Sequence, residues 1–151
     1  MTGEPLLPPI DAEAEPFWEG TRRGELRVQQ CVETSRLIFP PRATSPWAPH
    51  AKPIWTTVSG RGRIWSFVVP HPPLLAPFAD LARYNVIVVA LDEDPTIRLI
   101  GNLVARDGGA IDEVDASSIE IGAAVRVTFD PVSKEFSLPR WVIAAEAASK
   151  S

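Results

Sequence analysis

The sequence predicts a mainly β protein with one short helix near its N-terminus, and three features predict this fold class. Runs rich in β-branched and aromatic residues recur through the second half of the chain, each bounded by Gly, Pro or Asp. One N-terminal segment carries the Pro and Gly signals of a short helix. The 16 prolines, about twice the usual share, cluster at 40–53 and 70–77 and predict rigid loops.

The helix is predicted at about residues 15 to 23. Pro16 suits the first helical position, where its missing N–H is not needed, and Gly24 can end the helix in the left-handed conformation. Phe17 and Trp18 offer apolar anchors. The period then changes to two in LRVQQC, residues 26–31, which predicts a strand with one apolar face.

The remaining elements are predicted to be strands. Two short fragments, LIFPP and IWTTV, lie on either side of a proline-rich segment. In SGRGR, Gly60 and Gly62 are predicted to bend the chain into the first strand of the second half. Five stronger runs follow, at 64–69, 84–91, 97–105, 125–129 and 136–144. Five short strands with few helices predict a small closed barrel, and the OB-fold is the commonest five-stranded choice.

Composition is typical of one globular unit that buries a core, with 45% hydrophobic and 23% charged residues. The sequence contains no apolar run near the roughly 18 residues that a membrane span needs, and MTGEPLLPPIDAEAE lacks the pattern of a signal peptide. The single cysteine, Cys31, excludes an internal disulfide. We therefore expect a cytoplasmic protein that does not enter a membrane.

Charge is unevenly distributed along the chain. Residues 21–63 carry eight basic and two acidic residues, whereas the segments on both sides are acidic in balance. Such a basic segment could meet nucleic acid, a phosphorylated cofactor or an acidic partner, or it could be a solvated face.

The segment CVETSRLIFPPRATSPWA, residues 31–48, has the paired spacing of a zinc knuckle but lacks most of the ligands. The four ligand positions would be Cys31, Thr34, Ser45 and Ala48, and only the first binds zinc well. His50 and Glu33 could add donors, but without paired spacing. We therefore predict no zinc site. Proline stiffness and buried rings are expected to replace the metal, with the rings coming from Phe39, Trp47 and Trp55.

Several segments in order resemble one known family: PFWEG, GELRVQQC, LIFPPR, VSGRGRIWSF, VALDE, IRLIGNLV and the IxIG before VxVTF. The family comprises bacterial and archaeal proteins in which a helix and a rubredoxin-like zinc ribbon precede an OB-fold. The resemblance covers roughly residues 16 to 140. It implies an N-terminal arm and helix at 1–25, a degenerate, zinc-free ribbon at 26–56 and an OB-fold at 57–145.

The resemblance also implies a function. Members are similar to accessory subunits of thiolases, of thiolase-like aldolases that cleave steroid side chains, of hydroxymethylglutaryl-CoA synthase and of related acyltransferases. The expected partner is thus a thiolase-like protein, in a two-plus-two heterotetramer. No cofactor is expected to be held tightly, and a coenzyme A thioester would be shared with the partner.

The residues themselves offer little for independent catalysis. Cys31 is the only thiol, no histidine stands in a pairing motif with it, and GxSxG, HExxH and GxxxxGK[ST] are all missing from the sequence. Cys31 is expected to pack as a small apolar residue. Asp92, Glu93 and Asp94 precede Pro95 between two strands, which predicts a hairpin turn rather than a carboxylate pair. We expect no catalysis by the chain alone.

One loop is long enough to suggest a binding role. PHPPLLAPFADLARY carries His71, Leu74, Leu75 and Phe78, whose apolar members could either close the barrel mouth or dock onto a partner. The residues predicted to contact acyl-CoA or a partner are Phe17, Trp18, Arg42, Trp47, Arg61, Arg63, His71, Leu74 and Leu75.

Two other functions remain open from sequence. Arg61, Arg63 and Trp65 could serve an OB-fold that binds single-stranded nucleic acid, although the acidic second half argues against this. Alternatively, the arginines could bind the phosphates of CoA in a stand-alone acyl-CoA-binding protein.

Overall fold

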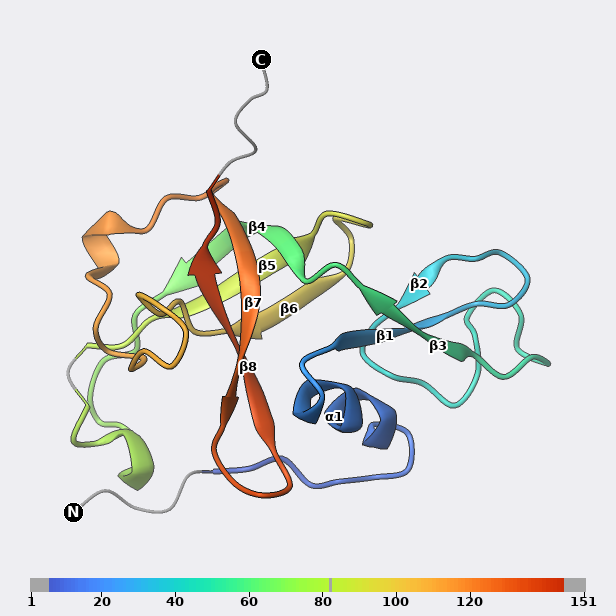
Figure 1. Ribbon diagram of the computed structural model, residues 1–151, viewed down its shortest axis with the longest axis horizontal. Coiled ribbons are helices and arrows are strands. Elements are labelled where there is room, and N and C mark those ends of the chain that lie inside the picture. Colours follow the sequence, from blue (N-terminus) through green and yellow to red (C-terminus); the bar gives the residue numbers. More distant parts are fainter. Residues whose placement is uncertain (1–5, 82, 146–151) are drawn as a thin grey trace.

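The computed structural model describes residues 6–81 and 83–145, which form one short helix and two antiparallel sheets (Figure 1). In chain order the elements are α1 Glu15–Arg22, β1 Leu26–Gln30, β2 Leu37–Ile38, β3 Ile54–Val58, β4 Arg61–Val68, η1 Ala76–Phe78, β5 Val86–Leu91, β6 Arg98–Gly101, η2 Ala116–Ser118, β7 Ala124–Pro131 and β8 Ser137–Ile143. The mainly β fold class is confirmed.

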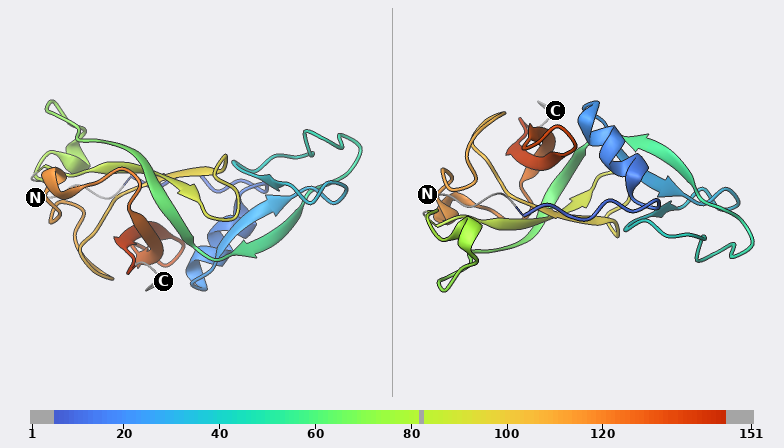
Figure 2. Two further views of the ribbon diagram at one scale, coloured as in Figure 1. Left: turned by 90° about the horizontal axis from the view of Figure 1, so that it is seen from above. Right: turned by 90° about the horizontal axis from the view of Figure 1, so that it is seen from below.

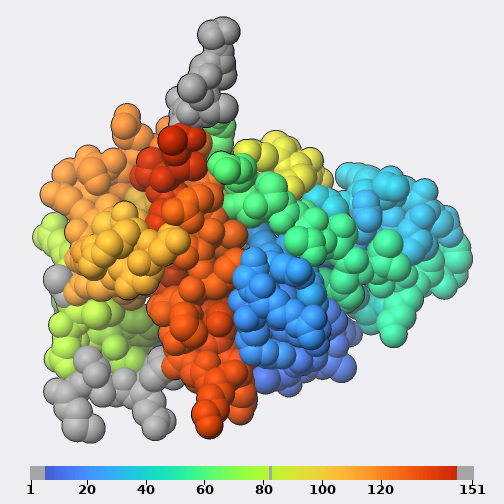
Figure 3. Space-filling model, viewed as in Figure 1, coloured from blue at the N-terminus to red at the C-terminus, as the bar shows by residue number. Residues whose placement is uncertain are grey.

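Helix α1 begins and ends as its sequence predicts. Pro16 lies in its first turn, and Gly24 follows its end with a φ of 76°, in the left-handed region that glycine enters without strain. The helix lies against the β7–β8 hairpin, as Figure 3 shows for the blue and orange segments. Arg22 holds it there, because its Nη1 donates a 2.8 Å hydrogen bond to the carbonyl oxygen of Glu135.

The first sheet has the strand order β2-β1-β3 and forms the ribbon module. Leu26 of β1 pairs with Val58 of β3, and Gln30 pairs with both Ile54 and Leu37. Two long connections, at 31–36 and 39–53, extend beyond the sheet. Figure 2 shows them at one end of an elongated molecule, and we call them the ribbon tip.

The second sheet has the order β6-β5-β4-β7-β8 and curls into a half-barrel, the arrangement expected of an OB-fold. Its two edges meet just after β6, where Trp141 of β8 donates its N–H to the carbonyl of Asn102 and accepts from Val104. Buried Asn85 fixes this corner by donating to the carbonyl of Leu103 and accepting from its N–H. Strand β6 is therefore shorter than the run at 97–105.

The segment at 92–96 is the turn that the sequence predicts. Asp94 accepts hydrogen bonds from the N–H and the hydroxyl of Thr96, at 3.0 and 2.7 Å, and Ile97 donates to the Asp94 carbonyl. Glu93 accepts from the N–H of Ser59. These carboxylates stabilise backbone turns, so the hairpin interpretation is confirmed.

A single core joins the two sheets. Leu26, Val28 and Val58 of the ribbon pack in the same buried cluster as Ile64 and Trp141 of the half-barrel. Among the described residues, no helix is long and apolar enough to cross a bilayer.

Candidate partner-binding surface

The two aromatic residues of α1 lie in different surroundings. Phe17 is 7% exposed and packs in the main core, where its ring centroid lies 5.8 Å from that of Phe39. This burial does not fit the expected contact between Phe17 and a partner, because the ring is already enclosed by the chain. Trp18 is half-buried, and its ring meets that of Phe136 edge-on at 5.0 Å.

A groove of about 360 Å³ opens beside Trp18, and we call it the Trp18 groove. Phe78 and Tyr84, whose rings stack with centroids 5.4 Å apart, form part of its wall. Its lining is mainly apolar, with further contributions from Val86, Ile100, Gly101, Asn102, Leu138, Pro139 and Arg140. Helix α1 and the loop that connects β4 to β5 thus each contribute a side chain to the groove.

The outer face of strands β4, β5 and β6 carries a group of apolar side chains that are exposed or half-buried, with Arg63 and Arg98 at its border. Val88 lies between Ser66 and Ile100 in the ladder, and Val86 pairs with Val68, so these side chains share one face. Ile100 is 72%, Val68 60% and Trp65 51% exposed. We call Trp65, Val68, Val86, Val88 and Ile100 the outer sheet face. It is continuous with the Trp18 groove, because Val86 and Ile100 belong to both.

The predicted binding loop surrounds one side of this surface. His71 and Leu75 are exposed, the latter by 66%, whereas Leu74 is half-buried. A short 3₁₀ turn, η1, presents Phe78 to the Trp18 groove. Phe78 thus lines the groove while Leu75 is exposed, so docking of this loop onto a partner stays a prediction.

The other predicted residues lie elsewhere, except Arg63, which pairs with Ala90 and borders the outer sheet face. Trp47 is on the ribbon tip, with the guanidinium carbon of Arg36 3.9 Å from its ring centroid, and together with Arg42 it lines a separate hollow of about 270 Å³. Arg61 and Arg63 are exposed on β4, and Arg63 donates to the carbonyl of Gly122 at 2.9 Å. The predicted residues therefore do not converge on one site.

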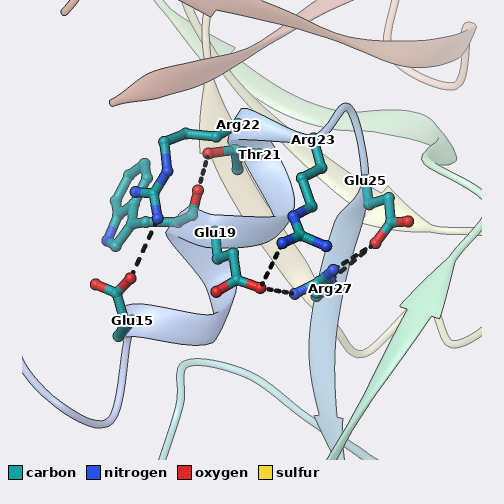
Figure 4. A network of polar contacts seen from close by, with 8 residues as sticks. Glu15, Glu19, Thr21, Arg22, Arg23, Glu25 and Arg27 are labelled. Atoms are coloured by element: carbon teal, nitrogen blue, oxygen red, sulfur yellow. Dashed lines mark hydrogen bonds and ion pairs between the residues drawn. The ribbon is translucent and has the colours of Figure 1, made fainter. Parts of the chain in front are cut away.

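The basic segment is partly neutralised by its own neighbours (Figure 4). Arg27 pairs with Glu25 at 2.8 Å and Glu19 at 3.5 Å, and Arg23 lies 3.7 Å from Glu19. The hydrogen bond to Glu25 is the main reason that the pKa of Arg27 is raised above its ordinary value. Arg22 pairs with Glu15. These arginines stabilise the helix and β1 rather than forming one phosphate-binding patch.

The four ligand positions of the ribbon come together, but their side chains do not fit zinc. Cys31 and Ser45 are each 1% exposed, and Ala48 is fully buried. Hydrogen bonds with Ser45 and then Thr34 lower the pKa of the Cys31 thiol to about 7, against the opposing effect of burial. One thiol, two hydroxyls and a methyl group are no set of four zinc ligands. Among the described residues, no group of three His, Cys, Asp or Glu side chains could hold a metal.

The expectation that rings fill the metal's place is wrong. Phe39 and Trp55 pack against the main core, and Trp47 is 39% exposed beside Arg36. The space is instead occupied by a small cluster of short side chains, Cys31, Ile38, Ala48 and Ala51. Small side chains are enough to fill this space because the two turns that carry the ligand positions, at 31–34 and 45–48, approach each other closely there.

The sequence analysis missed Val68 and Ile100 of the outer sheet face, and it missed Tyr84, which is buried in the wall of the Trp18 groove. The signal for Val68 and Ile100 was the alternation in the strand runs, where every second residue must face away from the core. The alternation could not say which outward face stays uncovered, since that depends on which other elements pack there.

Comparisons with known proteins agree with this architecture. The family model for the "ChsH2, C-terminal OB-fold domain" matches residues 55–130, and that for the "ChsH2, rubredoxin-like zinc ribbon domain" matches residues 18–44. A solved structure described as "Ltp2-ChsH2(DUF35) aldolase" superposes with a TM-score of 0.73 at 25% identity, over 92% of this chain and all of that one. A DUF35 protein of unknown function from Sulfolobus solfataricus, 11% identical, superposes with a TM-score of 0.56 over 88% of this chain and 86% of that one, which supports the fold alone.

Two curated relatives extend the comparison. The 3-oxo-4,17-pregnadiene-20-carboxyl-CoA hydratase alpha subunit of Mycobacterium tuberculosis is 35% identical over 115 residues, or 75% of this chain. This chain spans only 32% of that relative's length. A "DUF35 domain-containing scaffold protein" of Methanothermobacter thermautotrophicus is 32% identical over 76% of this chain and 78% of its own length. The resemblance seen in the sequence is confirmed, and the chain belongs to the ChsH2 and DUF35 family, in which a rubredoxin-like ribbon precedes an OB-fold.

Proposed function

We propose that this protein is a noncatalytic accessory subunit of a thiolase-type acyl-CoA enzyme. It binds its partner through the outer sheet face and contributes the Trp18 groove to the binding of the acyl group. A two-plus-two assembly with the partner is part of the proposal. The observation that carries it is the exposed apolar surface formed by Trp65, Val68 and Ile100 beside an apolar groove.

The outer sheet face has the character of an interaction surface. A large apolar patch on a chain of this size usually marks a protein contact. It includes a tryptophan, Trp65, one of the residue types that contribute most to binding energy in interfaces. Arg98 lies over the Trp65 ring at 3.8 Å and gives the patch a charged rim.

The Trp18 groove has a size and lining that suit part of an acyl group. Its volume of about 360 Å³ lies at the lower end of the range for small-molecule pockets. Arg140 at its edge is held by Asn102 at 2.6 Å and by Asp130, so the polar wall is rigid. The groove is open on one side, and we propose that the partner closes it.

The relatives support the same proposal. One relative is a 3-oxo-4,17-pregnadiene-20-carboxyl-CoA hydratase alpha subunit, another is a scaffold protein, and the superposed structure is an Ltp2-ChsH2(DUF35) aldolase. Each name describes a protein that acts with others.

The alternative of single-strand nucleic-acid binding has less support. Base stacking requires an open aromatic face within a basic groove, and Arg98 already covers one face of Trp65. A nucleic-acid binder would copurify with material that absorbs at 260 nm and that high salt removes.

The proposal is tested by coexpressing this chain with the thiolase-like proteins of its own genome and measuring complex formation by size-exclusion chromatography with light scattering. Ile100→Asp places a charge in the outer sheet face and is expected to weaken the complex at least about tenfold, since burying an unpaired charge in an interface is costly.

Val32→Asp is the matched control, because Val32 is 47% exposed but lies on the ribbon tip. It should leave the complex intact. Equal binding by both variants would show that the outer sheet face is not the docking site. Thioester turnover by the isolated chain would contradict the accessory role itself.

A further inference from the structure

The ribbon has the fold of a zinc-binding module, but its side chains do not form a set of zinc ligands. Some other interaction must therefore hold its two turns together. The match to the rubredoxin-like zinc ribbon covers residues 18–44. Of the four positions with paired spacing, only Cys31 carries a zinc ligand, and hydroxyls or a methyl group stand at the others. The contacts at the ribbon tip explain how the two turns stay together.

All four positions still meet at one point. The side chains of Ser45 and Thr34 lie close enough to the Cys31 thiol to lower its pKa by hydrogen bonding. Ala48, which is fully buried, packs with Cys31 in the small cluster, and it forms an isolated bridge with Ser45. Each position is therefore in contact with at least one other, and Cys31 stands at the centre.

In each turn one ligand position accepts a backbone N–H, at the second position of the first pair, Thr34, and at the first position of the second pair, Ser45. In the first turn, the N–H of Arg36 donates to Thr34 Oγ1 at 3.3 Å, and in the second the N–H of Trp47 donates to Ser45 Oγ at 3.2 Å. In both bonds the donor is the backbone N–H of the residue two positions after the ligand position. A metal-bound thiolate at the same place would accept the same N–H, so the hydroxyls preserve the backbone of each turn.

Further contacts tie the first turn and β1 to the second connection. The Glu33 carboxylate lies 2.6 Å from His50 Nε2, and Arg36 stacks on Trp47 at 3.9 Å. Buried Gln29 accepts from the N–H of Arg42 at 2.7 Å and donates to its carbonyl at 2.9 Å. Several separate contacts thus connect the segments that one metal ion would join.

We propose that the ribbon is a metal-free module whose two turns, at 31–34 and 45–48, keep the arrangement of a zinc-ligand set. The turns are held together by the polar contacts of Cys31, by the small cluster around it, and by the side-chain contacts between the two connections. It follows that three substitutions, Thr34→Cys, Ser45→Cys and Ala48→Cys, complete a four-thiolate site. The native chain binds no zinc.

Metal analysis of the purified native chain and of T34C/S45C/A48C, both grown with added zinc, tests the proposal. The native chain should contain no zinc, and the variant should contain one zinc per chain. Cobalt substitution of the variant should produce the absorption bands of tetrahedral thiolate coordination. One zinc per native chain would overturn the proposal, and so would a folded triple variant that takes up no metal.

A second variant with the same number of cysteines serves as the control. T34C/S45C/A43C places its third new thiol at exposed Ala43, in the same connection but away from the meeting point. This control should lose zinc to a chelator that T34C/S45C/A48C withstands. Equal retention by both would contradict the preserved arrangement.

The single variant S45C keeps the test decisive if the triple variant fails to fold. Its new thiol would face Cys31, so mild oxidation should form an intramolecular disulfide, measured by mass spectrometry and thiol titration. A43C should not form one. Failure of S45C to form the disulfide would show that positions 31 and 45 do not meet.

Discussion

Gly60 occupies a position that no other residue fits. It lies between β3 and β4 with a φ of 78°, and its carbonyl accepts from the N–H of Val127 at 2.7 Å. A Cβ at this position would lie 2.5 Å from Cγ1 of Val127. Both backbone conformation and space therefore require glycine, which agrees with the predicted bend at SGRGR.

Gly60→Ala is expected to destabilise the protein by about 2–4 kcal/mol, the sum of left-handed strain and overpacking. Gly108→Ala is the matched control, since Gly108 has the same φ of 78° and would bring its Cβ within 4 Å of nothing. It should cost only about 1–2 kcal/mol. Urea unfolding measures both.

The variant Val127→Ala separates the two contributions to the Gly60→Ala effect. In its background the overpacking should disappear, so that Gly60→Ala costs about as much as Gly108→Ala. An unchanged difference between the two glycine variants would show that Val127 is not the obstacle.

Phe17 and Cys31 show how much of a side chain's surroundings can be predicted from residue type alone. The sequence identifies Phe17 as an apolar anchor but not the surface it meets, because that depends on β1 and Phe39, which fold against it. For Cys31 the predicted burial is correct, since the thiol is 1% exposed. The paired spacing already placed Ser45 and Thr34 at one site with Cys31, but not the hydrogen bonding that lowers the pKa of its thiol, because that depends on how the two turns pack.

At the scale of elements, α1 is attached to β1 by charge and packing together. Arg27 of β1 has a side chain only 19% exposed, and it passes beneath the helix at Gly20, where a Cβ would lie 2.7 Å from its Cδ. Glu19 and Glu25 hold its guanidinium, as Figure 4 shows. The methylene stem thus packs while the charge is paired.

Arg27→Ala is expected to cost about 1–2 kcal/mol, because it removes both the packing and the pairing. Arg23→Ala, which removes a side chain that is 67% exposed and 3.7 Å from Glu19, should change stability by less than about 0.5 kcal/mol. Chemical denaturation measures both. Equal costs for the two variants would show that Arg27 contributes only a surface ion pair.

The ribbon is an element whose energetics differ from those of a zinc finger. A structural zinc supplies about 10–16 kcal/mol of folding free energy in isolated fingers, whereas exposed pairs such as Glu33–His50 contribute about 0–1 kcal/mol. The contacts at the tip need not match the metal, because Leu26, Val28 and Val58 already anchor the ribbon in the main core. Only the tip depends on them.

At the scale of the whole molecule, the two sheets form one cooperative unit. The ribbon strands β1 and β3 share their core with the half-barrel. The ribbon tip has only the small cluster of Cys31, Ile38 and Ala48, with Ala51 against it. A large shared core favours joint unfolding, whereas a small satellite cluster opens locally at lower free energy.

Hydrogen exchange should therefore report equal opening free energies for the amides of β1 and β5, and lower values for Ser35 and Ala51 in the tip. Ile87→Val, at a fully buried position of β5, should lower protection in both β1 and β5 by about 0.5–1.5 kcal/mol.

Val32→Ala, on the exposed tip, is the control and should leave the protection of β1 unchanged. A loss of protection confined to the half-barrel in Ile87→Val would show that the ribbon and the OB-fold unfold separately.

The sequence by itself determined the element types and their order, because alternation, proline and glycine act locally and can be recognised without knowledge of contacts. It determined the family through the order of the matching segments. It also determined that three of the four ligand positions of the ribbon carry no zinc ligand, because residue type alone decides this. Only the tertiary structure decided that Phe17 is internal, that Trp65, Val68 and Ile100 share an uncovered face, and that a small cluster around Cys31 fills the metal's place. These facts depend on which segments, far apart along the chain, pack together and which surfaces their packing leaves open.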